Sequence, residues 1–354
     1  MIKTEQPLLL ALAVVLILGA IVFLQAGKAT PTPSSLPSDS VLAGASPSSK
    51  ADFVAAPELQ GIAGYLNAPE GFRLSDVKGK VILVDFWTYS CINCIRTLPY
   101  LVDWHAKYAD QGLVIVGVHT PEFDFEKKLD NVQAAVAEHD IQYSVVLDND
   151  YATWRAYRNQ YWPHKYLVDA DGYIRYDHIG EGGYEETEAQ IVKLLQERNA
   201  SIAMNRSTRT VAAEAPGDVR TPEIYFGYQF IRQPLGNDQE LSAETPINFS
   251  FPASDAFEPN LAYLDGTWIL KRDYAELVSD RGQVALTFFA GKANIVAGAP
   301  TAQMVSVQLD GRLHQHVAVQ AHDLYPIASA SKASEHTMVF NVSKGFQLYT
   351  FTFG

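Results

Sequence analysis

The stretch VDFWTYSCINC, at residues 84–94, decides which fold is predicted for this chain of 354 residues and contains both of its cysteines. The apolar run VILV at residues 81–84 leads into it and is typical of a buried strand. Apolar residues after the motif, over 95–105, recur at helical spacing. A strand that leads into a C-x-x-C pair at the start of a helix is typical of a thiol redox site. The sequence therefore predicts that Cys91 and Cys94 lie at the N-terminus of a helix.

Thiol–disulfide exchange needs a thiolate on one cysteine and a second thiol that resolves the mixed disulfide. We expect Cys91 to attack, because the free N–H groups and the dipole of a helix end favour its anion. Lowering a thiol pKa from about 8.5 to about 7 corresponds to roughly 2 kcal/mol. Cys94, one turn further in, would resolve. Two alternatives stay open here: a structural disulfide, whose short loop adds little stability, and a metal site, which needs two more ligands.

An uncharged apolar run extends from Leu8 to Leu24, with Lys3 before it and Lys28 after it. Its 17 residues would span about 25 Å as a helix, near the lower limit for crossing a bilayer. The run is also longer than the apolar region of a cleaved signal peptide, roughly 7–15 residues. We therefore expect residues 1–28 to be a single-pass signal anchor in the cytoplasmic (inner) membrane, with a cleaved signal as the alternative. The rest of the chain would be extracytoplasmic, in the periplasm.

Composition divides the rest of the chain into four parts. Residues 29–51, rich in Pro, Ser, Ala and Thr, are expected to form a flexible linker. Strands and helices alternate over 52–199, which predicts an α/β domain with a mixed sheet and helices on both faces. Residues 200–216 are polar and are expected to be a second linker. Short aromatic and β-branched runs over 217–354 predict an all-β sandwich or jelly roll.

Within the alternating region, individual elements follow from the pattern. An Asp-Gly turn at 171–172 indicates a hairpin between strands at 165–169 and 173–177. The other expected elements are strands over 112–118 and 144–147 and helices over 125–139, 150–160 and 185–198. In the all-β region, the runs expected to be strands include 224–228, 268–270, 284–289, 304–309 and 347–351.

The charge of the chain excludes one class of partner. Its formal net charge is −13, whereas binding to nucleic acid requires a basic surface. A hydrophobic content of 47% with 19% charged residues is typical of globular domains.

The residues around the C-x-x-C pair resemble thioredoxin. The triplet DFW at 85–87 precedes the pair, and Pro99 lies five residues after Cys94. The sequence YWPH at 161–164, just before a strand, resembles the loop that carries the cis-proline of thioredoxin. The longer insertion between the second strand and its helix resembles the exported, membrane-tethered TlpA/ResA branch of thioredoxin-like proteins.

Four further stretches are similar to the C-terminal portion of DipZ proteins. They are WTYSCINC at 87–94, HTPEF at 119–123, TPEIYFG at 221–227 and YTFTFG at 349–354. This resemblance covers roughly residues 52–354. It implies a thioredoxin-like domain followed by a carbohydrate-binding-module-like β-sandwich. The chain departs from DipZ at its front, where DipZ proteins carry a multi-span electron-conducting domain and this sequence has a single expected anchor.

The resemblance implies roles for four catalytic residues. Cys91 would exchange disulfides with the substrate and Cys94 would resolve, so that the only redox group is the Cys91–Cys94 disulfide and no separate cofactor is needed. Asp85 would relay a proton to or from Cys94 from beneath the site. Pro163 would be the cis-proline that faces the disulfide, since a cis bond before proline costs only about 0.5–1 kcal/mol. Pro99 would kink the long helix rather than act in catalysis.

Other residues are candidates for substrate binding. Trp87 would pack beside the cysteines, and the backbone of Trp162 would pair with an extended substrate strand. Glu122 would lie near the cysteines and tune the pKa of Cys94, with a surface-loop carboxylate as the alternative; the role of His119 in the same motif is left open. His164 would contact the thiolate or face solvent.

The β-region offers two weaker candidate sites. Aromatic residues could stack on the rings of a glycan, although core packing is the preferred interpretation for most; those considered are Tyr225, Tyr228, Trp268 and Tyr325. His314 and His316 would lie on one strand face, but no third metal ligand is evident.

The resemblance favours an exported thiol–disulfide oxidoreductase that reduces exported proteins and receives electrons from a CcdA/DsbD-like membrane protein. An oxidase or isomerase remains an alternative, because the residues between the cysteines do not fix the potential. A peroxiredoxin-like peroxidase is a second alternative, since Thr88 lies three residues before Cys91. A copper- or glycan-binding protein is a third.

Overall fold

The computed structural model describes residues 53–199, 218–253 and 256–354. The anchor expected at residues 1–28 and the linkers expected at 29–51 and 200–216 lie outside these ranges. Within the described ranges, no helix is both long and apolar enough to cross a membrane. The anchor therefore stays a prediction.

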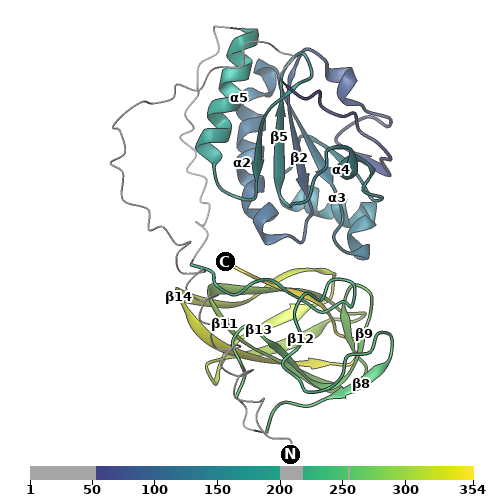
Figure 1. Ribbon diagram of the computed structural model, residues 1–354, viewed down its shortest axis with the longest axis vertical. Coiled ribbons are helices and arrows are strands. Elements are labelled where there is room, and N and C mark those ends of the chain that lie inside the picture. Colours follow the sequence, from purple (N-terminus) through teal and green to yellow (C-terminus); the bar gives the residue numbers. More distant parts are fainter. Residues whose placement is uncertain (1–52, 200–217, 254–255) are drawn as a thin grey trace, which may run out of the picture. The chain divides into compact units, whose positions relative to one another are not determined.

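The α/β region contains a six-stranded sheet with the order β1-β4-β3-β2-β5-β6 (Figure 1). Its strands are β1 (Gly64–Leu66), β2 (Val81–Trp87), β3 (Leu113–His119), β4 (Ser144–Leu147), β5 (His164–Val168) and β6 (Ile174–Ile179). The β2–β3 and β3–β4 pairs are parallel, and the remaining pairs are antiparallel. Parallel neighbours need a long crossover, which helix α2 (Ile92–Tyr108) provides between β2 and β3. The predicted mixed sheet is confirmed.

Helices cover both faces of this sheet, because alternate residues of a strand point to opposite sides. The remaining helices are α3 (Leu129–Glu138), α4 (Ala152–Ala156) and α5 (Tyr184–Arg198). Leu83 of β2 packs in a core with residues from α2, α3 and α5. Its neighbour Val84 packs in a second core with Trp154 from α4. Every residue of β2 is therefore buried, and the strand that carries Asp85 runs through the middle of the domain.

Two helices differ from the prediction. Instead of one helix over 125–139, the chain forms a 3₁₀ turn at Asp124–Lys127 and then α3, because the residue between them has extended backbone angles. The helix predicted over 150–160 is limited to α4. Tyr151 and Arg158, on either side of it, have positive φ angles of 59° and 53°, whereas helical residues have negative φ.

The predicted hairpin between β5 and β6 is confirmed. Its turn places Gly172 at a φ of 96°, a conformation that glycine adopts without the steric cost of a side chain. The Gly172 N–H donates to the Asp169 carbonyl at 3.0 Å and closes the turn.

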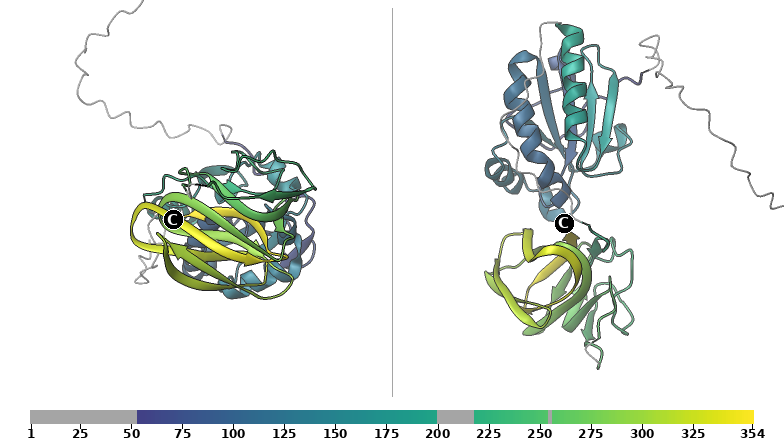
Figure 2. Two further views of the ribbon diagram at one scale, coloured as in Figure 1. Left: turned by 90° about the horizontal axis from the view of Figure 1, so that it is seen from below. Right: turned by 90° about the vertical axis from the view of Figure 1, so that its left-hand side faces the viewer.

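The second fold is all-β, as predicted. Its strands are β7 (Ile224–Tyr225), β8 (Pro246–Phe249), β9 (Ala262–Leu270), β10 (Ala275–Leu277), β11 (Arg281–Gly298), β12 (Gln303–Leu309), β13 (Arg312–Val319), β14 (Asp323–Ser343) and β15 (Gln347–Phe353). They join in one sheet, with β7 paired to β15 and β11 paired to β9 as well as to β14 and β15. The long strands β11 and β14 shift register along their pairing, and such irregularities bend strands. The right-hand view of Figure 2 shows the yellow strands near the C-terminus curling strongly. Hydrogen bonds join the strands in one sheet, and the sandwich or jelly-roll arrangement stays a prediction.

The aromatic residues considered for sugar stacking have different environments. Trp268 is fully buried, and its indole N–H donates to the Asp265 carbonyl at 2.9 Å. The Tyr325 hydroxyl donates to the Ala321 carbonyl at 2.7 Å. Tyr228 is 44% exposed. Core packing is thus confirmed for Trp268, which a sugar ring cannot reach.

The two histidines of β13 have separate partners. His314 Nε2 accepts the Ser329 N–H at 3.2 Å, and His316 Nδ1 lies 3.0 Å from Ser306 Oγ. Within the described residues, no group of three or more His, Cys, Asp or Glu side chains could hold a metal ion.

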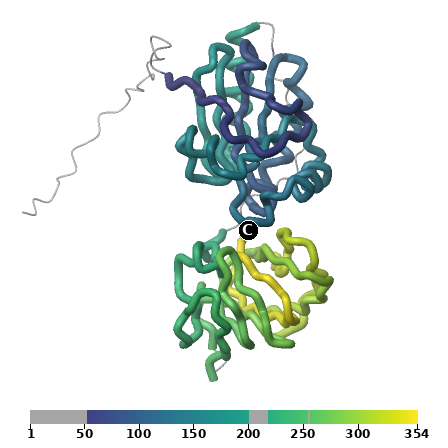
Figure 3. The backbone as a smooth tube through the Cα atoms, turned by 90° about the vertical axis from the view of Figure 1, so that its right-hand side faces the viewer, coloured from purple at the N-terminus to yellow at the C-terminus, as the bar shows by residue number. Residues whose placement is uncertain are grey.

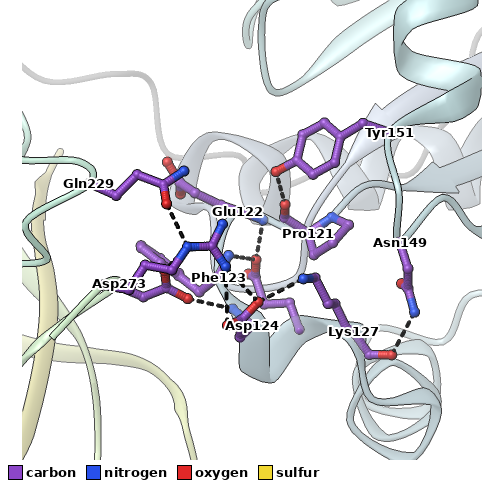
Figure 4. Close-up of polar contacts among 11 residues, drawn as sticks. Pro121, Glu122, Phe123, Asp124, Lys127, Asn149, Tyr151, Gln229 and Asp273 are labelled. Carbon is purple, nitrogen blue, oxygen red and sulfur yellow. Dashed lines mark hydrogen bonds and ion pairs between the residues drawn. The ribbon is translucent and has the colours of Figure 1, made fainter.

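The segment after β3 belongs to the α/β fold and packs against the all-β fold. Phe123 and Phe125 pack on Tyr349 of β15, with ring centroids 5.1 and 4.8 Å apart. Between them, the Asp124 N–H donates to the Asp273 carboxylate at 2.9 Å (Figure 4). Figure 3 traces the backbone of the all-β fold to the C-terminal end of the chain. Residues of both folds therefore belong to one hydrophobic core.

Candidate active site

The two cysteines occupy unequal positions at the start of α2. Cys91 is the N-cap residue, with extended backbone angles, and it is half-buried. Its Sγ accepts the Cys94 N–H at 3.4 Å, so the thiol caps its own helix. Cys94 is 1% exposed, and both cysteines are free thiols. Burial raises the pKa of Cys94 well above its usual value. A hydrogen bond with Cys91 and the charge of Cys91 act in the same direction.

Asp85 lies beneath the cysteines in the middle of β2. It is 1% exposed, and neither carboxylate oxygen has a hydrogen-bond partner among the described residues. Burial raises the pKa of Asp85 to about 7, with Lys165 opposing the shift. The charge of Asp85 in turn contributes to the raised pKa of Cys94. A carboxyl group that titrates near neutrality beside the inner thiol is suited to exchanging a proton with it.

Aromatic side chains enclose this inner part of the site. Trp87 is fully buried, and a Cβ added to Gly117 on the neighbouring strand would lie 2.9 Å from its indole nitrogen, so glycine makes room for the ring. His119 packs edge-on to Trp87 and stacks on Tyr89, with centroids 5.2 and 5.7 Å apart. Burial lowers the pKa of His119 to about 3, so its ring is uncharged at neutral pH and lines the inner site as a neutral aromatic group.

The loop before β5 lies as the sequence motif predicts. The Trp162–Pro163 peptide bond is cis. The Trp162 indole N–H donates to the Thr120 carbonyl at 3.0 Å, which fixes its ring beside the site. His164 is buried, lies 2.6 Å from Asn159 Oδ1 through its Nδ1, and lies 3.0 Å from Asp177 through its Nε2. The solvent-facing alternative for His164 is therefore wrong.

Cys91 lines a cavity of about 390 Å³ whose walls come from both folds. The α/β fold contributes Cys91, Asn93 and Trp162, and the all-β fold contributes Tyr225 and Phe353. We call this cavity the active-site cleft. A substrate disulfide that reaches Cys91 would therefore touch the all-β fold as well.

Glu122 lies in the same cleft. Its Oε1 accepts the Tyr225 hydroxyl at 2.8 Å, and the same hydroxyl lies 2.9 Å from Glu223 Oε2. Burial and the nearby carboxylates of Glu223 and Glu126 raise the pKa of Glu122 to about 8. Glu122 is half-buried in its loop, and its influence on Cys94 stays a prediction. The causes of the raised pKa of Cys94 include Cys91 and Asp85.

Comparison with known proteins agrees with this geometry. Residues 54–177 match the AhpC/TSA family, and residues 221–354 match the thioredoxin-like C-terminal domain family. The thiol-disulfide oxidoreductase YkuV of Bacillus subtilis is 33% identical over 141 residues, which are 40% of this chain and 94% of YkuV. The chain belongs to the thioredoxin-like thiol–disulfide oxidoreductases.

Two further relatives match this oxidoreductase. DipZ of Mycobacterium tuberculosis is 37% identical over 304 residues, which are 84% of this chain but only 43% of DipZ. The oxidoreductase thus spans less than half the length of DipZ. ResA of Bacillus cereus is 27% identical over 122 residues, 34% of this chain and 68% of ResA. The resemblance to DipZ and ResA proteins, stated from motifs, is confirmed.

The sequence analysis missed Lys165 of the oxidoreductase. It pairs with Asp85 across β2 and β5, and directly paired residues project their side chains from the same face of a sheet. Lys165 is fully buried, and its ammonium group donates to the Gly180 carbonyl at 3.0 Å. Its position at the start of the predicted strand KYLV, two residues after Pro163, could have indicated a buried lysine near the site.

Glu126 was also missed. Its buried carboxylate accepts the Ser90 hydroxyl at 2.6 Å and the N–H groups of Glu122 and Phe123 at 2.5 and 2.9 Å. It therefore ties the loop before Cys91 to the loop that carries Glu122. The signal was a glutamate four residues after Glu122, at a position that faces inward among phenylalanines.

Proposed function

We propose that this oxidoreductase is a membrane-anchored, extracytoplasmic reductant of exported protein disulfides, with Cys91 as the attacking and Cys94 as the resolving thiol. One observation supports this above the others. Cys91 caps a helix and lines an open cleft, while Cys94 is buried one turn further in and lies near the carboxyl group of Asp85, which has no hydrogen-bond partner among the described residues. The attacking sulfur must meet the substrate, and the resolving sulfur must meet only Cys91.

The exchange proceeds in two balanced steps. The Cys91 thiolate attacks one sulfur of the substrate disulfide, which breaks the S–S bond, forms a mixed disulfide and releases the other sulfur as a thiolate that takes up a proton. Cys94 then gives its proton to Asp85 and attacks Cys91 Sγ. This forms the Cys91–Cys94 disulfide and expels the second substrate sulfur. Two electrons pass to the substrate, and no cofactor other than the dithiol takes part.

The surroundings of the cysteines would hold the substrate. Trp87 would pack beside the cysteines, and Trp162 and Pro163 would present a backbone edge to an extended segment around the substrate cysteine. Glu122 would adjust the thiol pKa from the cleft. A CcdA/DsbD-like membrane protein would return the dithiol to its reduced form.

The anchoring is supported by the apolar run at residues 8–24. The proposed domain bounds, 52–199 and 217–354 with linkers at 29–51 and 200–216, are supported by the described elements. The last helix of the α/β fold ends at Arg198, and the first strand of the all-β fold begins at Ile224.

The reduction potential tests the direction of electron flow. Equilibration of the Cys91–Cys94 pair with glutathione, followed by thiol alkylation, should give a value near that of thioredoxin, about −270 mV. A value near that of the oxidant DsbA, about −120 mV, would contradict a reducing role. The Cys94→Ser variant provides the control, because it should trap substrates as mixed disulfides without completing a cycle.

A second function, a peroxidase, is favoured by the AhpC/TSA match over residues 54–177. It would use Cys91 with Thr88, three residues before it. The Thr88 hydroxyl, however, lies 3.4 Å from His119 Nε2 on the buried side. Peroxide consumption that survives Cys94→Ser would support the peroxidase, and consumption that requires both cysteines would exclude its single-cysteine form.

A further inference from the structure

Three side chains in the active-site cleft form a continuous hydrogen-bonded chain. The Tyr225 hydroxyl lies 2.8 Å from Glu122 Oε1 and 2.9 Å from Glu223 Oε2. Glu122 belongs to the loop after β3, whereas Glu223 and Tyr225 belong to the all-β fold. All three line the cleft together with Cys91. We call them the cleft acid chain.

The geometry of Glu122, Tyr225 and Glu223 determines how many exchangeable protons these three side chains share. A phenol has one O–H group and can donate to one acceptor, and an ionised carboxylate can only accept. Tyr225 can therefore bond both glutamates only if one of them is protonated and donates to the phenol oxygen. With both hydrogen bonds formed, the cleft acid chain holds one exchangeable carboxyl proton and one negative charge.

The groups around the chain favour this state. The carboxylate of Glu126 is fully buried next to Glu122 and opposes a second negative charge there. The Arg232 guanidinium lies 5.3 Å from the centre of the Tyr225 ring and balances the charge that remains.

The other charged groups of the cleft are already paired. Arg96 and Glu181 form an ion pair at 3.2 Å, with exposed side-chain fractions of only 10% and 16%. Burial raises the pKa of both Glu122 and Glu223, that of Glu122 to about 8, in agreement with a proton retained at neutral pH.

Exchange at Cys91 would be faster with such a proton at hand. When Cys91 attacks, the expelled substrate sulfur leaves as a thiolate, and the more basic this thiolate is, the more slowly it leaves, so a proton donor would speed the expulsion of an aliphatic thiolate. Asp85 is buried on the side of Cys94 and does not line the cleft. The cleft acid chain faces the substrate side instead.

We propose that the Glu122–Tyr225–Glu223 chain is the general acid that protonates the first substrate sulfur to leave, so that the all-β fold contributes catalytic groups to the reaction. This inference rests on the proposed attack by Cys91. The step balances: the Cys91 thiolate, the substrate disulfide and the chain's proton give the mixed disulfide, one substrate thiol and a chain with one more negative charge. Water in the open cleft then returns the proton. In the reverse direction the same chain takes the proton of the incoming thiol.

Two substrates with different leaving groups test the proposal. An aliphatic hydroxyethyl disulfide expels a basic thiolate that needs a proton, whereas an aromatic nitrobenzoate disulfide expels a thiolate that stays unprotonated at pH 7. The variants are Tyr225→Phe and Glu223→Gln in the full chain, with Tyr228→Phe as the matched control because Tyr228 is exposed and outside the cleft lining. Single-turnover rates at pH 7 are compared for both substrates.

We expect Tyr225→Phe and Glu223→Gln to slow reduction of the aliphatic disulfide by roughly 10²-fold, the low end for general acid catalysis, and that of the aromatic disulfide by less than about twofold. The control should change neither rate. Equal loss with both substrates would show a structural role and overturn the proposal, and so would unchanged rates. A wild-type protein that reduces neither disulfide, or whose activity survives Cys91→Ser, would overturn the proposed function itself.

Discussion

The two sides of the active site hold their acidic groups in different ways. On the inner side, Asp85 is a single buried carboxyl group without a hydrogen-bond partner among the described residues, next to the buried thiol Cys94. On the cleft side, Glu122 and Glu223 share the hydroxyl of Tyr225. Burial raises the pKa of the inner group against the opposing charge of Lys165, whereas hydrogen bonds between two folds hold the cleft group. The difference suggests one acid–base group for each sulfur that must gain or lose a proton.

The largest effect should come from removing the cleft-side sulfur. Cys91→Ser should lower the rate of disulfide reduction by at least about 10³-fold, since loss of a nucleophile costs on the order of 10⁶ in other enzymes. Cys94→Ser, its matched control, should still complete the first step and accumulate a mixed disulfide detectable by mass spectrometry. If instead the Cys91→Ser variant accumulated the mixed disulfide, Cys94 would be the attacking thiol and Cys91 the resolving one.

The inner side should also limit stability in a pH-dependent way. The pKa of Asp85 is about 7 in the folded protein and 3.8 for an ordinary Asp side chain. A carboxyl group with a raised pKa in the folded state destabilises that state as the pH rises from about 4 to about 7, by about 4 kcal/mol at most. Asp85→Asn should therefore raise the free energy of unfolding in urea at pH 8 and leave it unchanged at pH 3.5. Asp150→Asn, at an exposed position, is the control. A loss of stability at pH 8 would contradict this origin of the pKa shift.

The cleft side should lose its proton at higher pH. Because the pKa of Glu122 is about 8 and the acid form is the active one, the ratio of aliphatic to aromatic disulfide reduction should fall as the pH rises through 8. Taking the ratio removes the ionisation of Cys91, which both reactions share. We expect a fall of about tenfold between pH 7 and 9, and a flat ratio in Glu223→Gln. If the ratio in the wild type did not change with pH, Glu122 would not be the group that protonates the leaving substrate sulfur.

The smallest effect concerns Lys165. Removing this buried cation in Lys165→Met should raise the pKa of Asp85 further, because a neighbouring positive charge favours the carboxylate. The shift should be on the order of one unit and can be followed by NMR titration of the Asp85 carboxyl carbon. A downward shift would contradict the pairing of these two side chains across β2 and β5.

Much of the inner side could be predicted from the sequence, because its groups are close along the chain or lie on neighbouring strands. Asp85, Cys91 and Cys94 fall within ten residues, and strand periodicity places Asp85 inside the domain. The cleft side could not be predicted in the same way. Tyr225 lies 103 residues from Glu122, and only the packing of one fold on the other brings their side chains together.

The errors in the fold have a similar cause. The pattern over 150–160 has helical periodicity, whereas positive φ angles at Tyr151 and Arg158 limit the helix to fewer residues. Tyr151 packs on Trp154 and Trp162, so its conformation depends on the loop that ends with the cis-proline. Local pattern therefore predicted which elements form, whereas contacts between distant segments decided where some of them end.

The most direct test of the unequal roles of the two thiols is alkylation of single-cysteine variants with iodoacetamide across pH. Cys94→Ser leaves Cys91 in the open cleft, and Cys91→Ser leaves Cys94 buried, with its pKa raised. The account predicts that Cys91 is alkylated readily at pH 7, while Cys94 stays unmodified until much higher pH or until the protein is unfolded. Equal rates for the two thiols at pH 7, or faster alkylation of Cys94, would contradict it.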